Sequence, residues 1–192
     1  MKKNIVIGVT GGIAAYKMLD VTSRLKKMDY EINVILTKNA CEFVKPLPFE
    51  TLSHNYVVTD TFNREQPWEV EHISLAKKAD IMLIAPATAN VIGKIANGIA
   101  DDMLTTTVMA ARCPVVIAPA MNTAMYENPI VQENIRYLKE KGYIFIEPDC
   151  GMLACGDVGA GKLPSPEQIA ACVEEILLNT RTKKDFLGKH VL

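Results

Sequence analysis

Residues 4–12 read NIVIGVTGG, a β-branched apolar run that ends in a threonine and a pair of glycines. An apolar run without polar alternation is typical of a strand that is buried on both faces, as in a parallel sheet. It is followed by an apolar stripe at helical spacing, formed by Ala14, Met18, Val21, Leu25 and Met28. A strand followed directly by a helix predicts the first unit of an α/β domain.

The same alternation continues along the chain. Further apolar runs bounded by Gly, Pro or Asp lie at 32–37, 81–86, 114–119 and 143–148. Residues 125–141 and 166–178 have helical patterns. The sequence therefore predicts an α/β fold with a doubly wound parallel sheet and right-handed crossovers. Residues 46–71 have weak periodicity, and we expect loops and irregular structure there. Residues 150–168 show no helical or strand period until a helix begins at their end.

Composition narrows the classes of protein to consider. The chain has 192 residues, 49% of them hydrophobic and 22% charged, and a net charge of −1, which is typical of one globular domain. Lys and Arg are scattered, so nucleic-acid binding is not expected. The first apolar run stops at Val9, which is too short for a signal peptide or a membrane span. Five cysteines without paired CxxC spacings indicate free thiols in a reducing compartment, so we expect a cytoplasmic protein.

Polar loops follow the first two strands, where ligands of such folds bind. Gly11 and Gly12 allow a tight turn, and a helix that begins near Ile13 offers backbone N–H groups to an anion. The glycines are also explained by the turn alone, and the GxGxxG dinucleotide pattern is absent. Thr37 ends the second strand, where its hydroxyl suits a phosphate or a ribityl chain, or simply forms a turn.

The loops after the next two strands add further polar groups. Thr88 and Asn90 can present a hydroxyl and an amide, while Ala87 and Ala89 leave room for a flat ring. Asn122 follows the next strand. Each of these polar residues can alternatively be a helix N-cap. Because four polar loops meet at one sheet edge, we expect a binding site for a phosphorylated planar cofactor.

Five motifs together resemble the flavin-dependent cysteine decarboxylases. They are GGIAAYK (11–17), HISLAKKAD (72–80), PATAN (86–90), PAMNTAMYENP (119–129) and ACGDVGAGK (154–162). The resemblance covers residues 1–178. It implies a Rossmann-like, flavodoxin-like fold with a three-layer αβα arrangement, bound FMN, and trimers with the flavin near subunit contacts, often assembled into dodecamers. The implied reaction is the decarboxylation of 4'-phosphopantothenoylcysteine to 4'-phosphopantetheine in coenzyme A biosynthesis.

The resemblance also assigns roles to residues. The flavin contacts carried over are Gly11, Gly12, Ile13, Thr37, Thr88, Ala89, Asn90, Val91 and Ala120. The substrate contacts are Met121, Asn122, Ala154, Cys155, Gly156 and Lys162. The catalytic residues are His72, Asn122 and Cys155. No metal is implied. The chain departs from the family pattern at Val91 for Thr, at Tyr126 for Trp, and at Lys162 with Leu163 for Arg-Met.

The implied chemistry explains why such residues are needed. Loss of CO₂ from a cysteinyl carboxylate needs an electron sink, which oxidation of the thiol-bearing carbon to a thioaldehyde provides, with FMN as hydride acceptor. His72 would act as base or hydrogen-bond partner, and Asn122 would hold the carboxylate. The enethiol must then be reduced by the FMNH₂ just formed, which needs a hydride and a proton, and we expect the proton from Cys155. An inert buried thiol is the alternative for Cys155, and two cysteines alone, 150 and 155, make zinc improbable.

The end of the chain has a different character. Residues 179–192 form a polar tail, and its final GKHVL resembles the first strand of the ligase domain that follows in bifunctional bacterial members. We expect 1–178 to be the domain and the tail to be disordered linker. Residues 165–168, SPEQ, read as a capping box. Two other functions remain open: a flavin prenyltransferase on the same fold and a non-catalytic flavin-binding regulatory protein.

Overall fold

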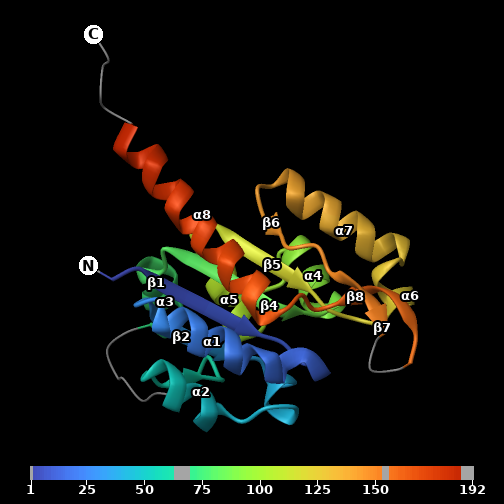
Figure 1. Ribbon diagram of the computed structural model, residues 1–192, viewed down its shortest axis with the longest axis horizontal. Helices are drawn as coiled ribbons and strands as arrows, with labels where there is room; N and C mark the ends of the chain where they lie inside the picture. Colours follow the sequence, from blue (N-terminus) through green and yellow to red (C-terminus); the bar gives the residue numbers. More distant parts are fainter. Residues whose placement is uncertain (1, 63–69, 153–155, 187–192) are drawn as a thin grey trace.

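The computed structural model describes residues 2–62, 70–152 and 156–186, in which a parallel sheet lies between two layers of helices (Figure 1). Its strands are β1 (Asn4–Val9), β2 (Glu31–Leu36), β3 (Val57–Val58), β4 (Ile81–Ala87), β5 (Val115–Pro119) and β6 (Ile144–Phe145). The order across the sheet is β3-β2-β1-β4-β5-β6. The predicted doubly wound, Rossmann-like fold is confirmed, and the winding reverses between β1 and β4.

The strands divide their side chains between two cores. Ile5 and Ile7 of β1 face the layer of α1 (Met18–Lys27), α2 (Pro46–Ser53) and α8 (Pro166–Phe186), whereas Val6 faces the opposite layer. That second layer consists of α3 (Glu71–Lys78), α4 (Ala89–Ala96), α5 (Met103–Ala110) and α7 (Pro129–Glu140). Burial on both faces explains why the strands read as continuous apolar runs rather than alternating ones.

Two expectations from the sequence were wrong in the middle of the chain. Residues 46–71, expected to be irregular, contain α2 and the short strand β3. Pro46 begins α2, where a missing backbone N–H costs nothing, so the prolines there do not break the helix. Residues 125–141, expected to be one helix, form α6 (Thr123–Tyr126) and α7, because the Asn128 side chain caps α7 and Pro129 starts it.

The glycine-rich segment after β6 was also expected to lack strands, and this is wrong. Strands β7 (Asp149–Met152) and β8 (Val158–Lys162) pair antiparallel as a separate hairpin, with Gly151 opposite Gly159. Glycine has a low β-strand propensity, so the amino-acid pattern of this segment did not indicate strands. Two short 3₁₀ helices complete the fold, η1 (Ile13–Lys17) and η2 (Ala40–Glu42).

The last helix runs further than the sequence pattern indicates. Helix α8 continues to Phe186 and projects past the sheet (Figure 1), so the expectation of a disordered tail from residue 179 is wrong as far as 186. The division into 1–178 and 179–192 stays a prediction, and residues 187–192 lie outside the described part. None of the helices in that part is long and apolar enough to cross a membrane.

Thr10 joins the two strands at which the winding reverses. Its Oγ1 donates to the Pro86 carbonyl oxygen at 2.6 Å and accepts from the Thr88 backbone N at 3.1 Å. The side chain is fully buried. A buried hydroxyl with both a donor and an acceptor role fixes the loop after β4 against the end of β1.

We expect Thr10→Val to lower the free energy of unfolding by about 1–3 kcal/mol, because the substitution keeps the shape but leaves a buried carbonyl and a partly buried N–H without their partner. Chemical denaturation monitored by circular dichroism measures this. The control is Thr22→Val, since the equally buried Thr22 hydroxyl donates only to Met18 O within its own helix. An equal loss in both variants would contradict the bridging role of Thr10.

Candidate functional site

A cavity of about 460 Å³ opens at the carboxyl ends of β1, β4 and β5. Its size is typical of a site for a small molecule or cofactor. Three strand-end loops and the β7–β8 hairpin supply the walls. The lining residues are Gly11, Gly12, Ile13, Ala14, Tyr16, Lys17, Pro86, Thr88, Ala120, Met121, Asn122, Met125, Met152, Gly161, Lys162 and Leu163.

The loop after β1 brings backbone close to this cavity. A Cβ on Gly11 would lie 2.5 Å from Asn39 Cβ, so this position requires glycine for close packing. A Cβ on Gly12 would meet only Thr88 Cγ2, at 3.9 Å, which leaves open space on the cavity side. The first hydrogen bond of η1 is donated by Ala15 N, so the N–H groups of Ile13 and Ala14 have no partner within the helix. Such N–H groups can bind an anion, and that they do so here stays a prediction.

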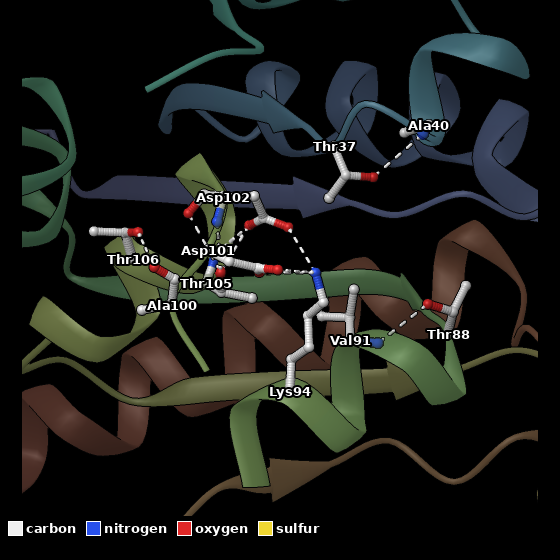
Figure 2. A network of polar contacts seen from close by, with 10 residues as sticks. All are labelled: Thr37, Ala40, Thr88, Val91, Lys94, Ala100, Asp101, Asp102, Thr105 and Thr106. Atoms are coloured by element: carbon white, nitrogen blue, oxygen red, sulfur yellow. Dashed lines mark hydrogen bonds and ion pairs between the residues drawn. The ribbon is translucent and has the colours of Figure 1, made fainter. Parts of the chain in front are cut away.

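Of the residues predicted to bind a ligand in and after the loop that follows β4, one lies at the cavity and another lies in the core. Thr88 lines the cavity and also caps α4, where its Oγ1 accepts from Val91 N at 3.4 Å (Figure 2). Val91 is 3% exposed and packs in the second core. Neither Val91 nor Ala89 and Asn90 line the cavity.

A polar network stabilises the far end of α4 (Figure 2). Lys94 Nζ donates to both carboxylate oxygens of Asp101, at 2.7 and 2.9 Å. This hydrogen bond holds the pKa of Asp101 below its usual value. The neighbouring Asp102 caps α5 by accepting from Thr105 N at 2.8 Å. These contacts join the end of α4 to the start of α5.

The loop after β5 presents Ala120, Met121 and Asn122 to the cavity, as predicted. Asn122 caps α6, where its Oδ1 accepts from Ala124 N at 2.8 Å. This fixes the carboxamide orientation, and Nδ2 donates to Asp157 Oδ2 at 2.5 Å. The capping prediction for Asn122 is therefore confirmed, and the residue also lines the cavity, while its contact with a substrate stays a prediction.

The β7–β8 hairpin forms the remaining wall through Met152, Gly161 and Lys162. Met121 N donates to Gly161 O at 3.0 Å. Gly161 has φ +128°, and a Cβ there would lie 2.3 Å from Met121 O, so only glycine allows this approach. Gly156 does not line the cavity, and Ala154 and Cys155 lie outside the described residues.

Thr37 and His72 are not among the residues that line the cavity. The Thr37 hydroxyl accepts from Ala40 N at 3.2 Å (Figure 2), which is the turn-forming alternative. His72 is half-buried in the first turn of α3, a helix that packs against α5. Their contacts with a ligand stay predictions.

Several cavity residues were missed by sequence reasoning. Lys17 and Tyr16 line the cavity and belong to the GGIAAYK motif. They follow the two glycines by about one helical turn, and this spacing could have indicated that they lie at the same cavity. Met125 lies one turn after Asn122 and gave a similar signal. Met152 had none, because only the hairpin pairing brings it to the cavity.

Tyr126 secures α6 beside the cavity. Its hydroxyl donates to Glu147 Oε2 at 3.1 Å, and Lys139 Nζ donates to Glu147 Oε1 at 2.5 Å. Burial and the nearby Glu147 charge raise the pKa of Tyr126 to about 12. The phenol therefore stays protonated and remains a donor at physiological pH. Tyr126 thus anchors the helix that begins at Asn122.

The donor set fits a ligand that combines a planar apolar part with anionic groups. Ile13, Tyr16 and the methionines supply apolar surface, and the unfilled space beside Gly12 leaves room for a phosphate at backbone distance. Lys17 and Lys162 add positive charge. Across the described ranges, no three His, Cys, Asp or Glu side chains gather in a way that would hold a metal ion.

Comparison with known sequences identifies relatives over the whole described chain. The profile of the flavoprotein family matches residues 1–178. The coenzyme A biosynthesis bifunctional protein CoaBC of Bacillus subtilis is 51% identical over 190 residues, 99% of this chain and 47% of that protein. A Streptococcus mutans protein named "probable phosphopantothenoylcysteine decarboxylase" is 45% identical over 92% of this chain and 100% of its own length. The chain thus spans about half the length of the bifunctional relatives that it matches.

Solved structures share the fold. The FMN-dependent cysteine decarboxylase SpaF superposes with a TM-score of 0.79 at 34% identity, covering 92% of this chain and 96% of SpaF. A cysteine-to-serine mutant of PPC decarboxylase, complexed with pantothenoylaminoethenethiol, superposes with a TM-score of 0.81 at 31% identity. That match covers 91% of this chain and 98% of the mutant.

Gly11 and Gly12 should respond differently to alanine. We expect Gly11→Ala to lower the free energy of unfolding by about 1–3 kcal/mol, because its Cβ would overlap Asn39. Gly12→Ala should change stability by less than about 1 kcal/mol, since the backbone there is extended and the space is open. Denaturant titration of the two variants tests this, and a larger loss for Gly12→Ala would contradict the packing described.

Proposed function

The chain belongs to the flavoprotein family, and from that premise we propose that it is an FMN-dependent carboxy-lyase that converts 4'-phosphopantothenoylcysteine to 4'-phosphopantetheine in coenzyme A biosynthesis. The observation that carries the proposal is the meeting of three parts at one cavity. These are the glycine loop after β1, Asn122 after β5, and the glycine hairpin that carries Lys162.

FMN is the proposed cofactor. Backbone N–H groups of the glycine loop and the start of η1 would bind its phosphate, with Lys17 nearby to neutralise charge. Thr88 and Ala120 would lie along the ring and its side chain. Bound FMN would supply reversible hydride acceptance from the thiol-bearing carbon of the substrate. The relatives' names support this choice, since the structures similar to this chain include FMN-dependent cysteine decarboxylases.

Asn122 and Lys162 would hold the anionic end of the substrate. The carboxamide oxygen of Asn122 is committed to Ala124 N, so its Nδ2 is the end that can donate to a carboxylate. Lys162 lines the same cavity from the hairpin and brings a cation to the carboxylate. Lysine provides charge without the bidentate fork of arginine, so we expect this contact to be less directional than in family members with arginine.

His72 would complete the site from a neighbouring copy of the chain. It is the proposed base, but it does not line the cavity of its own chain. A trimer that places the cavity at a subunit contact would bring in a histidine from the adjacent α3. We therefore propose a homotrimer, assembled further into a dodecamer, as the active form.

The chain also fits the first half of a two-domain enzyme. Its 47% coverage of the Bacillus subtilis relative supports a phosphopantothenate-cysteine ligase domain after residue 178. Four cysteines in the described part, 41, 113, 150 and 172, are free thiols, which supports a reducing, cytoplasmic location. A flavin prenyltransferase would not need the Asn122 motif or the cysteine-bearing loop, and a non-catalytic regulatory flavoprotein would not need His72 and Cys155.

The proposal predicts a yellow protein that loses CO₂ from its substrate. Purified protein should bind one FMN per chain in a spectrophotometric titration. Loaded with FMN, it should release CO₂ from 4'-phosphopantothenoylcysteine and form 4'-phosphopantetheine, as identified by mass spectrometry. Asn122→Asp should retain FMN but lower turnover by about 100-fold or more, because a second carboxylate would repel that of the substrate. A protein that binds no FMN, or that leaves the substrate intact, would refute the proposal.

Cys155→Ser should separate the two halves of the reaction. Decarboxylation leaves an enethiolate, and forming the product from it would need both the hydride held by the flavin and a proton on carbon. A thiol with an ordinary pKa of about 8.5 can donate that proton, whereas a serine hydroxyl is a far weaker acid. We therefore expect CO₂ release in a first turnover and a product two hydrogens lighter than 4'-phosphopantetheine. The PPC decarboxylase cysteine-to-serine mutant complexed with pantothenoylaminoethenethiol supports this expectation. Fully reduced product at the normal rate would assign Cys155 a structural role.

A further inference from the structure

The β7–β8 hairpin is held on the segment that carries Asn122 by backbone contacts. Besides the hydrogen bond from Met121 N to Gly161 O, a Cβ on Gly159 would lie 2.6 Å from Thr123 Cγ2. Strand β8 therefore approaches Met121 and Thr123 more closely than a residue with a Cβ could. Because these contacts fix β8, its first residue, Val158, also has a fixed position relative to Asn122.

Asp157 immediately precedes Val158, the first residue of β8. Its carboxylate accepts a hydrogen bond from Asn122 Nδ2 at 2.5 Å. Asn122 Oδ1 is bound to Ala124 N, so the carboxamide cannot turn without losing its helix cap. The Asn122 side-chain N–H that faces the hairpin therefore donates to the carboxylate of Asp157. A substrate that ends in a cysteine also carries a carboxylate, which is the same kind of acceptor.

We propose that Asp157 determines the specificity of the carboxylate subsite by occupying Asn122 until a substrate carboxylate replaces it. This inference rests on the proposed function. The Nδ2 of Asn122 has two N–H groups, and Asp157 accepts from the amide on the side of the hairpin. A second carboxylate at the same Nδ2 would lie close to that of Asp157, and the two like charges would repel each other. A ligand with a carboxylate therefore competes with Asp157, whereas a ligand without one binds with the Asp157 contact intact.

The exchange also explains how the product leaves. Loss of CO₂ removes the group that held Asn122, and Asp157 can then return to it. Asp157 is exposed, so its carboxylate can leave Asn122 for the solvent. Each turnover would begin with Asp157 leaving Asn122 and end with its return.

The test compares two ligands on FMN-loaded protein by isothermal titration calorimetry. One is phosphopantothenoylserine, which keeps the carboxylate but lacks the thiol and cannot be oxidised to a thioaldehyde. The other is the product, 4'-phosphopantetheine, which has no carboxylate. Asp157→Ala should tighten binding of the serine analogue about three- to tenfold, the effect of removing one competing hydrogen bond. Product affinity should change less than about twofold.

Two further variants distinguish this role from a structural one. Asp157→Asn keeps a neutral acceptor of weaker strength, so it should tighten the analogue less than Asp157→Ala does. The charge control is Glu127→Gln, at the other end of α6 and outside the cavity, which should leave both affinities unchanged. Weaker or unchanged analogue binding in Asp157→Ala, or an equal gain for the product, would overturn the inference.

The calorimetric result is independent of turnover, so the two proposals fail separately. A wild-type protein that binds the analogue without releasing CO₂ from the substrate would refute the proposed function alone. A decarboxylase whose Asp157→Ala variant gains no affinity for the analogue would refute the inference alone. Wild-type protein that binds neither ligand would refute both.

Discussion

The hydroxyl of Thr10 is the contact on which the site depends. The winding of the sheet reverses between β1 and β4, so the loops that follow these strands run toward opposite helical layers and leave a gap between them. Thr10 spans this gap by bonding both Pro86 O and Thr88 N. Without that bridge the cavity walls would belong to two independently placed loops. With it, the glycine loop and the start of α4 form one rigid surface.

The second constraint is the space beside residues 121–123. Gly159 and Gly161 let β8 approach this segment at distances that no Cβ allows. The hairpin therefore needs no apolar core of its own, since it is positioned by backbone contact with a loop that is itself fixed by β5. This is why a segment with many glycines, which are usually associated with disorder, can supply one ordered wall of the cavity and carry Lys162 and Asp157 into place.

The central strands could be predicted because their burial on both faces produces an unmistakable apolar run, and β1 was predicted to the residue. The pieces that were missed lack such a signal for physical reasons. Val57–Val58 is an edge strand of only two residues, α2 is stabilised by the burial of Phe49 rather than by periodicity, and β7–β8 is held by backbone contacts. In each case tertiary contact decides the structure, and local sequence does not encode it.

The candidate site was predictable at the strand ends but not in the roles of single side chains. Sequence reasoning treated capping and binding as alternatives for Thr88 and Asn122, yet both residues cap a helix and line the cavity. The two roles support one another. By accepting from Val91 N, Thr88 fixes the first turn of α4 and the position of its own hydroxyl at the cavity. By accepting from Ala124 N, Asn122 fixes the direction of its own Nδ2. A cap at a cavity edge thus prepares donors for a ligand.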